Sequence, residues 1–292
     1  MTSQFSYHTE KLLELPSLGD TVKSHKLNTQ KSLGQHFLFD LNLTSRIARS
    51  AGDLKGHIAI EVGPGPGGLT RSLLMHDVEK LIVIERDQRC IPIMKELQNI
   101  VGSERLVIIN DDAMVVDETA LLSAHNPQNL PVRIIANLPY NIGTELVVKW
   151  LECKKNWYKT ATLMLQKEVV DRIVSSPGSK TYGRLSVLSQ LLCNAHSIFD
   201  VPPEAFTPPP KVMSAILHLE RLDQPRFPAD ISILSQLTKQ SFGQRRKMLR
   251  ASLKSITADS ESFLHAAGIE PTRRPESLSV EEFCKLSNIP LK

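Results

Sequence analysis

Residues 57–70 read HIAIEVGPGPGGLT, and this stretch decides the fold. Its apolar part, Ile58–Val62, is rich in β-branched residues, which predicts a short buried strand. Four glycines follow between positions 63 and 68, and they permit a turn whose backbone angles disfavour residues with a Cβ atom. Residues 69–74 then predict the first turns of a helix that packs back on the strand. A strand, a glycine turn and a helix in this order form the first βα unit of a nucleotide-type fold.

The glycine turn admits two classes of ligand. Gly63, Gly65 and Gly68 satisfy the GxGxxG spacing of dinucleotide-binding enzymes. However, Pro64 and Pro66 carry no N–H group, so the turn lacks two of the donors that would hold a pyrophosphate. A nucleoside with an amino-acid tail and no phosphate, such as S-adenosylmethionine, needs fewer of those amides. Both ligands remain open at this point, as does a turn that binds nothing.

The composition is that of an ordinary globular chain. Its 292 residues suffice for a main domain with a smaller one, and 41% are hydrophobic and 23% charged. No apolar run approaches the roughly 20 residues of a membrane span, and the N-terminus lacks a signal-peptide pattern. We therefore expect a cytoplasmic protein with no membrane partner. The four cysteines are widely spaced without a CxxC pair, so neither a metal site nor a disulfide framework is indicated.

Strand and helix patterns alternate after this first unit. The further strands are expected at residues 80–85, 105–110, 133–136 and 161–165. The helices are expected at residues 87–101, 117–123, 144–154 and 167–175. This alternation predicts an α/β fold, a Rossmann-like doubly wound sheet with helices on both faces. Ligands of such sheets bind at the carboxyl ends of the strands, so the polar residues there are expected to line one crevice.

Two of these strand ends carry acids. Glu85 lies 18 residues beyond Gly67, where a carboxylate can accept hydrogen bonds from ribose hydroxyls. Asp111 and Asp112 end the following strand, and one of them can accept from an adenine amine beside Ala113. The other acid is expected to cap the loop only.

The stretch NLPYNIGT at 137–144 carries the second chemical signal. Pro139 restricts Leu138, so the Leu138 carbonyl can point into the crevice beside the Asn137 side chain. Two acceptors and the flat ring of Tyr140 suit a planar base with an exocyclic NH2 group. They would turn the lone pair of that nitrogen toward an electrophilic methyl group, which is catalysis by orientation and requires no general base. An asparagine-capped turn with a core tyrosine is the alternative.

The chain changes character after residue 222. A connector, FTPPPKV at 206–212, leads to an expected edge strand at 212–219, and a linker follows at 223–228. Helical spacing at 231–242, 244–255, 261–267 and 280–286 predicts a small all-helical domain. Residues 231–258 contain six basic residues and no acidic residue, which favours a phosphate-binding surface over a solvated helix face.

Seven segments, taken in order, resemble the ribosomal RNA adenine dimethylases, and the small-subunit branch of that family above all. They are KSLGQHFL at 31–38, EVGPGPGGLT at 61–70, NDDAM at 110–114, NLPYNIGT at 137–144, LMLQKEVVDR at 163–172, YGRLSVLSQ at 182–190 and FTPPPKV at 206–212. The likeness covers about residues 28–290. It implies an S-adenosylmethionine-dependent enzyme, with S-adenosylhomocysteine as product and no metal. The implied substrate is 16S rRNA within the small ribosomal subunit, where two adjacent adenosines near the 3′ end become dimethyladenosines during subunit biogenesis.

The resemblance assigns roles to individual residues. The cofactor-binding residues would be Gln35, His36, Leu38, Gly63, Gly65, Glu85, Asp112, Ala113 and Asn137. The target base would lie against the catalytic set Asn137, Leu138, Pro139, Tyr140 and Phe206. Apart from the resemblance, the acid-free basic stretch predicts that RNA is bound by Arg245, Arg246, Lys247 and Arg250, and Lys211 of the connector is a further candidate for a phosphate contact. The sequence departs from the family at His36, where the family usually has Asn.

The expected organisation is a flexible N-terminal extension at 1–27, a methyltransferase domain at 28–222 and a helical RNA-binding domain at 223–292. No long heptad demands a partner, so a monomer is expected. Two alternatives stay open. One is a dimethylase of large-subunit RNA, and the other is a relative that binds RNA or DNA and no longer methylates.

Overall fold

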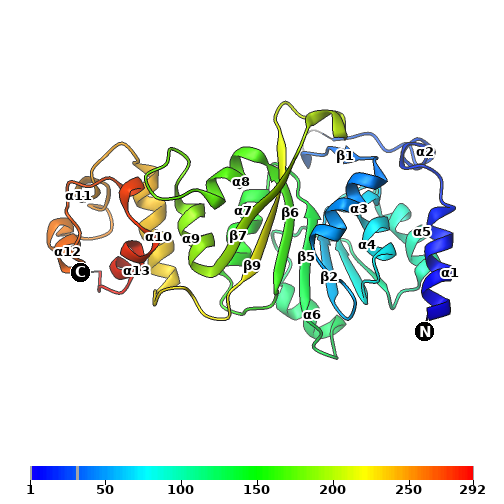
Figure 1. The fold of residues 1–292 in the computed structure, drawn as a ribbon, viewed down its shortest axis with the longest axis horizontal. Helices are drawn as coiled ribbons and strands as arrows, with labels where there is room; N and C mark the ends of the chain where they lie inside the picture. The colour runs from blue at the N-terminus through cyan, green and yellow to red at the C-terminus, as the bar shows by residue number, and fades with distance from the viewer. Residues whose placement is uncertain (1, 31–32, 292) are drawn as a thin grey trace. The chain divides into compact units, whose positions relative to one another are not determined.

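The computed structural model describes residues 2–30 and 33–291 (Figure 1). Lys31 and Ser32, which open the KSLGQHFL motif, lie outside the described residues, as do Met1 and Lys292. The chain divides into two compact units. The first comprises Met1–Val147, Lys155–Lys167 and Ile198–His218. The second comprises Val148–Lys154, Glu168–Ser197 and Leu219–Lys292.

A central sheet confirms the expected α/β class. Within the described residues it has seven strands in the order β4-β3-β2-β5-β6-β9-β7. The five strands from β4 to β6 pair in parallel. They are β2 (Ile58–Val62), β3 (Lys80–Ile84), β4 (Leu106–Ile109), β5 (Val132–Asn137) and β6 (Thr160–Gln166). All five residues of β2 are buried, as expected for an apolar strand at the centre of a sheet.

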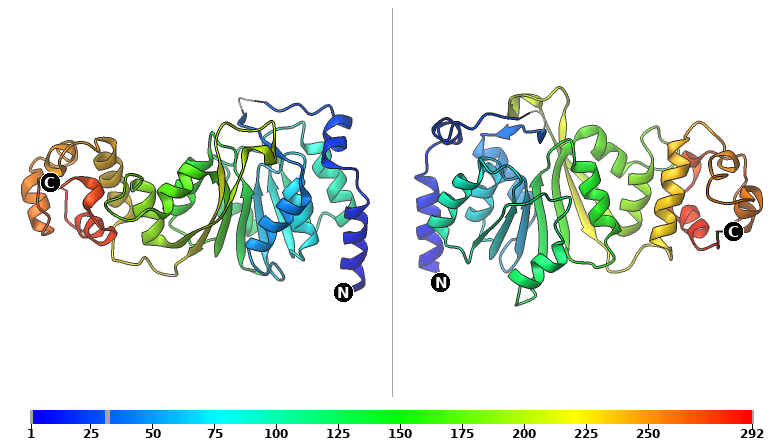
Figure 2. Two further views of the ribbon diagram at one scale, coloured as in Figure 1. Left: turned by 45° about the horizontal axis from the view of Figure 1, so that its top comes forward. Right: turned by 180° about the vertical axis from the view of Figure 1, so that it is seen from behind.

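The helices that follow the expected alternation are α4 (Gly68–Met75), α5 (Ile91–Val101), α6 (Glu118–His125) and α7 (Gly143–Glu152). A further helix, α3 (Leu41–Ser50), precedes β2. Helix α4 packs against α3, and it begins at Gly68, directly after the turn that follows β2. Figure 2 shows the fold from two further sides. Helix α5 begins four residues later than the expected start at residue 87, because residues 88–90 form a turn, in which the Asp87 carboxylate accepts from the Arg89 amide.

The sheet edge differs from the sequence expectation. The expected edge strand is β9 (Ser214–Arg221), but it lies between β6 and β7. The unpredicted strand β7 (Cys193–Val201) takes the edge. A further two-stranded pair joins β1 (Phe37–Leu38) and β8 (Phe206–Thr207), which are too short to leave a periodic signal.

The first 27 residues are not the flexible extension that the sequence suggested. They contain α1 (Thr2–Leu13) and α2 (Leu18–Ser24), and α1 packs against α4 and α5. Leu12, Leu18 and Leu27 are buried. The Arg71 guanidinium donates to the carbonyl of Pro16 at 2.7 Å and to the Thr21 hydroxyl at 3.1 Å. Buried leucines and these two bonds hold the segment on the first unit.

The second unit contains the expected helical region, with a different boundary. Helix α9 (Arg184–Leu192) packs against α10 (Ile231–Gly243) and α13 (Val280–Ser287), so it joins these helices and not the domain expected at 28–222. Aromatic contacts reinforce this core, since the ring of Phe242 lies 5.9 Å from Tyr182 and 5.6 Å from Phe283.

The remaining helices of this unit are α8 (Lys167–Val174), α11 (Leu249–Ser252) and α12 (Ser260–Ala266). The helix expected at 244–255 is therefore reduced to the short α11, and residues 244–247 form a turn. Among the described residues, none of the helices combines the length and apolar character that crossing a membrane requires.

Candidate active site

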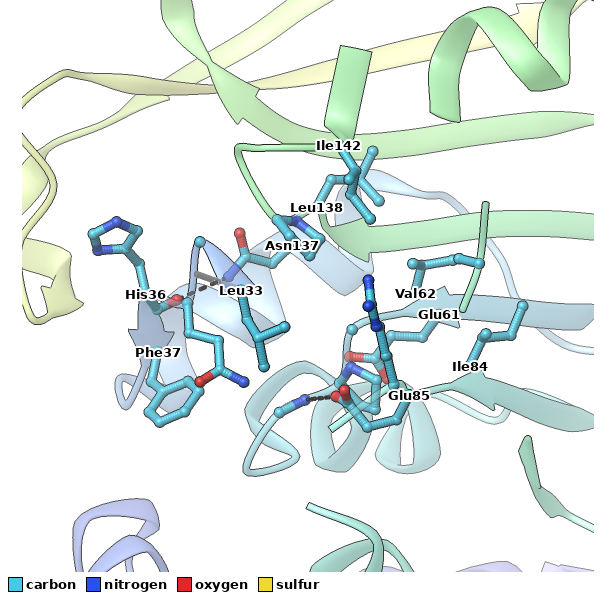
Figure 3. A pocket seen from close by; sticks show the side chains of 18 of the residues that line it. Leu33, His36, Phe37, Glu61, Val62, Ile84, Glu85, Asn137, Leu138 and Ile142 are labelled. Atoms are coloured by element: carbon cyan, nitrogen blue, oxygen red, sulfur yellow. Dashed lines mark hydrogen bonds between the residues drawn. The ribbon is translucent and has the colours of Figure 1, made fainter. Parts of the chain in front are cut away.

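A pocket lies in the first unit at the carboxyl ends of β2, β3 and β5 (Figure 3). The space between its lining residues is about 980 Å³, including open solvent. Its wall includes every predicted cofactor residue, namely Gln35, His36, Leu38, Gly63, Gly65, Glu85, Asp112, Ala113 and Asn137. Leu138, Pro139 and Tyr140 also line it. Phe206, Lys211, Arg245, Arg246, Lys247 and Arg250 do not.

Glu85 shapes the glycine turn. Its Oε2 accepts from the Gly65 amide at 3.0 Å, and its Oε1 accepts from the Asp87 amide at 2.7 Å. Burial raises the pKa of Glu85, although these amide bonds oppose that rise. Gly63 and Gly65 both have positive φ, and a Cβ at either position would meet Pro139 or Phe37 at 3.2 to 3.3 Å. The turn is therefore open to a ligand only while both positions stay glycine.

Glu61 is a pocket residue that the sequence reasoning missed. Its Oε2 accepts from the Thr70 hydroxyl at 2.7 Å, and the side chain is almost completely buried. Burial raises the pKa of Glu61 to about 8; the Thr70 bond opposes this rise, and the nearby carboxylate of Glu85 adds to it. Its position within the quoted EVGPGPGGLT motif was the available signal.

Asp87 is a second missed residue, and it connects the N-terminal segment to the end of β3. Its carboxylate accepts from Gln35 Nε2 at 2.8 Å and from two nitrogens of Arg89 at 2.9 and 2.6 Å. Burial works to raise the pKa of Asp87, but the bonds from Arg89 and Gln35 hold it below its ordinary value. Gln35 Oε1 also accepts from the Gln30 amide at 3.0 Å. The oxygen and the nitrogen of the Gln35 side chain are thus both hydrogen-bonded, and they fix the segment before the pocket.

The two acids after β4 differ in their bonding. Asp111 accepts from the Asp112 amide at 2.7 Å and so bonds locally. Asp112 accepts from the Met114 amide and forms an ion pair with Arg86 at 2.9 Å. Arg86 lines the pocket as well and was not anticipated.

Asn137 stands between the two halves of the pocket. Its Nδ2 donates to the His36 carbonyl at 3.3 Å, which leaves Oδ1 as the acceptor for a ligand (Figure 3). Leu138 is buried at the end of β5, and the Pro139 carbonyl accepts from the amides of Ile142 and Gly143, which starts α7. The Tyr140 hydroxyl bonds to the Ser214 hydroxyl, and burial raises the pKa of Tyr140.

Three rings gather beside this turn. The Tyr140 centroid lies 5.2 Å from that of His36 and 6.4 Å from that of Phe206. Phe206 is buried and lies on β8, which pairs with β1. The structure therefore brings together Tyr140 and Phe206, which the sequence placed in one pocket, and adds the His36 ring to them.

The residues predicted to bind RNA differ in their surroundings. Lys211 is exposed on the connector of the first unit. In the second unit Arg246 and Lys247 are exposed, whereas Arg245 donates to the Ser179 carbonyl at 3.1 Å. Arg250 pairs with Glu261 at 3.0 Å. Glu261 lies just beyond the acid-free stretch. The positive charge of this stretch is therefore partly neutralised, which its sequence alone does not indicate.

These features define a class of protein. A Rossmann-like sheet carries an acid-lined glycine turn that faces an asparagine and a tyrosine ring, which is the arrangement of a nucleoside-dependent group-transfer enzyme. The chain belongs to the ribosomal RNA adenine dimethylase family, whose sequence profile matches residues 26–291. It is therefore a methyltransferase of that family, and the resemblance seen in the sequence is confirmed.

Individual relatives agree with this placement. Proteins named Ribosomal RNA small subunit methyltransferase A from Ruegeria sp. (strain TM1040) and Mesorhizobium japonicum are 51% and 53% identical to this chain over 276 and 277 residues. The matches cover 94% of this chain and 96% and 98% of those proteins.

Two solved structures share the fold. A dimethyladenosine transferase from Plasmodium falciparum superposes with a TM-score of 0.67 at 24% identity, over 86% of this chain and 96% of that one. The 23S rRNA methyltransferase ErmE superposes with a TM-score of 0.61 at 25% identity, over 86% of this chain and 97% of that one.

Proposed function

We propose that the protein transfers methyl groups from S-adenosylmethionine to the N6 amines of two adjacent adenosines near the 3′ end of 16S rRNA. The observation that carries this is a single pocket in which the acid-lined glycine turn meets the NLPY turn and its aromatic rings. The small-subunit target is supported by the names of relatives that share about half of their residues with this chain. Such an enzyme acts in the cytoplasm on the assembling subunit, and we propose that it works as a monomer.

The residues present fit the cofactor. Glu61, Glu85 and Asp112 line the pocket with carboxyl groups, which suit the hydroxyls and the amine of a nucleoside. Pro64 and Pro66 lack the amides that a pyrophosphate would need. We assign cofactor binding to these acids together with Gln35, His36, Leu38, Gly63, Gly65, Ala113 and Asn137. When bound, S-adenosylmethionine supplies an electrophilic methyl group.

The chain itself orients the target. Asn137 Oδ1 and the Leu138 carbonyl accept the two hydrogens of the adenine amine and so aim its lone pair at the methyl group. Pro139 keeps Leu138 in an extended conformation, and the rings of Tyr140 and Phe206 hold the unstacked base. Transfer would form the nitrogen–carbon bond as the carbon–sulfur bond of the donor breaks, and the amine would then release a proton to solvent. Repetition on the same nitrogen gives dimethyladenosine.

The RNA is held by basic side chains of the protein. We assign this role to Lys211 in the first unit and to Arg245, Arg246, Lys247 and Arg250 in the second. Arg246 and Lys247 are the strongest members, because Arg245 and Arg250 already bond to protein groups. Contacts of this kind bind phosphate without reading sequence.

The test is methyl transfer from labelled S-adenosylmethionine to small ribosomal subunits that lack the modification, with large subunits as the control. Dimethyladenosine in 16S rRNA only is the expected result. Labelling of large subunits would favour a second candidate, a large-subunit dimethylase, which the likeness to ErmE brings forward. Tight RNA binding without labelling would refute the proposal and indicate a binding protein that no longer methylates.

A further inference from the structure

His36 touches more of the target side of the pocket than any role in cofactor binding requires. Its ring points away from Glu61 and Glu85, on the far side of Asn137 (Figure 3). The ring nitrogen Nδ1 lies 2.8 Å from the carbonyl oxygen of Pro208 in the connector. Because a carbonyl can only accept, Nδ1 carries the proton of this bond, and Nε2 of the neutral ring is left as an acceptor.

The same residue contacts both aromatic rings. Its centroid lies 5.2 Å from that of Tyr140 with the planes 32° apart, and 6.3 Å from that of Phe206 in an edge-on arrangement. These separations are within the range of attractive ring pairs. Each ring is thereby restrained on the side where His36 lies.

The backbone of His36 orients the catalytic amide. Its carbonyl accepts from Asn137 Nδ2 at 3.3 Å, which fixes Oδ1 on the opposite side of that amide. The residue that follows, Phe37, begins β1, whose pairing with β8 joins Leu38 to Phe206. His36 therefore connects Asn137 and Tyr140 with Phe206 and Pro208, which come from two separate parts of the chain.

We infer that His36 is a positioning residue of the target-adenine pocket, which ties the 206–212 connector to Asn137. This inference rests on the proposed function. The Nδ1–H bond holds the connector, the ring contacts hold the aromatic walls, and the carbonyl holds the acceptor for the adenine amine. Loss of the side chain displaces these groups while the acids around the glycine turn keep their places. It therefore impairs methyl transfer much more than it weakens cofactor binding.

Two substitutions distinguish the contribution of the Nδ1–H hydrogen bond from that of the imidazole ring. His36→Ala removes both. His36→Asn keeps a donor, because Asn Nδ2 is attached to Cγ as His Nδ1 is, and loses only the ring. We expect His36→Ala to lower kcat for small subunits by about 10- to 100-fold, since small misplacements of reacting groups have effects of this size. We expect His36→Asn to retain kcat within about threefold of wild type, with the KM for subunits little changed in either variant.

Cofactor affinity is measured separately, by equilibrium dialysis of S-adenosylmethionine without RNA. Because His36 is also assigned to the cofactor site, His36→Ala is expected to weaken cofactor binding by up to about threefold, which is less than its loss of kcat. His36→Asn is expected to bind within about twofold of wild type. The control is His57→Ala, because His57 also places Nδ1 against a carbonyl, that of Lys55 at 2.9 Å, but at the opposite end of β2. This variant is expected to leave both measurements unchanged.

The outcomes are distinct. A loss of cofactor affinity that equals the loss of kcat in His36→Ala would overturn the inference, and so would an Asn variant as poor as Ala. Nitrogen NMR of the wild type adds a readout free of activity, with the Nδ1-protonated tautomer expected for His36; the Nε2-protonated form would also refute the inference. Failure of the proposed function would instead be seen in the wild type, as absence of transfer to small subunits.

Discussion

Replacement of Glu61 by Gln is expected to remove a pH-dependent loss of stability. Glu61 is buried with its Oε2 bonded to Thr70, and burial raises its pKa from 4.5 to about 8. The folded protein thus keeps a proton that the unfolded chain releases, so stability falls as pH rises between these two values and does not fall further above the upper one. Gln cannot ionise, and its amide oxygen can still accept from Thr70.

The size of the effect follows from the two pKa values. Well inside the interval between these two pKa values, each rise of one pH unit lowers the unfolding free energy by about 1.4 kcal/mol. Between pH 6 and pH 9 the wild type is therefore expected to lose about 2 to 3 kcal/mol more unfolding free energy than Glu61→Gln. Glu85 has a raised pKa as well, so the comparison with the variant is needed to isolate Glu61.

The assay is urea unfolding at several pH values across that range. Glu104→Gln is the matched control, because it removes an exposed carboxylate and is expected to leave the fall in place. Parallel curves for the wild type and Glu61→Gln from pH 6 to pH 9 would refute the reasoning, since they would mean that Glu61 releases its proton equally in both states.

Three further predictions concern the site and the RNA surface. Asn137→Ala is expected to abolish methyl transfer while RNA affinity stays near that of wild type, and equal losses in a binding assay and an activity assay would contradict its role. Arg246→Ala with Lys247→Ala is expected to weaken RNA binding and to reduce the slope of log affinity against log salt by up to about 0.7 to 0.9 per charge; an unchanged slope would mean a merely solvated surface. Asp87→Ala is expected to lower unfolding free energy by about 1 to 3 kcal/mol and to weaken S-adenosylmethionine binding, because Arg89 loses its partner and the segment before the pocket loses its bond. An unchanged affinity for S-adenosylmethionine in equilibrium dialysis would show that this segment does not contribute to cofactor binding.

Local signals in the sequence determined the parallel part of the sheet and the two turns of the pocket. The apolar run at 58–62 and the glycines after it specify a buried strand and a tight turn through side-chain and backbone preferences that act within a few residues. Pro139 acts in the same way on the turn after β5. The strand ends could therefore be placed together from the rule that parallel strands present their carboxyl ends at one edge.

Contacts between distant segments were decided only by the tertiary structure. His36 meets Pro208 across 172 positions and Gln35 meets Asp87 across 52, and no periodicity connects such pairs. The same holds for α1, which is held by packing against α4 and α5, and for Glu261, which compensates Arg250. These contacts depend on which surfaces become adjacent when the chain packs, whereas a local pattern reports only what a segment prefers by itself.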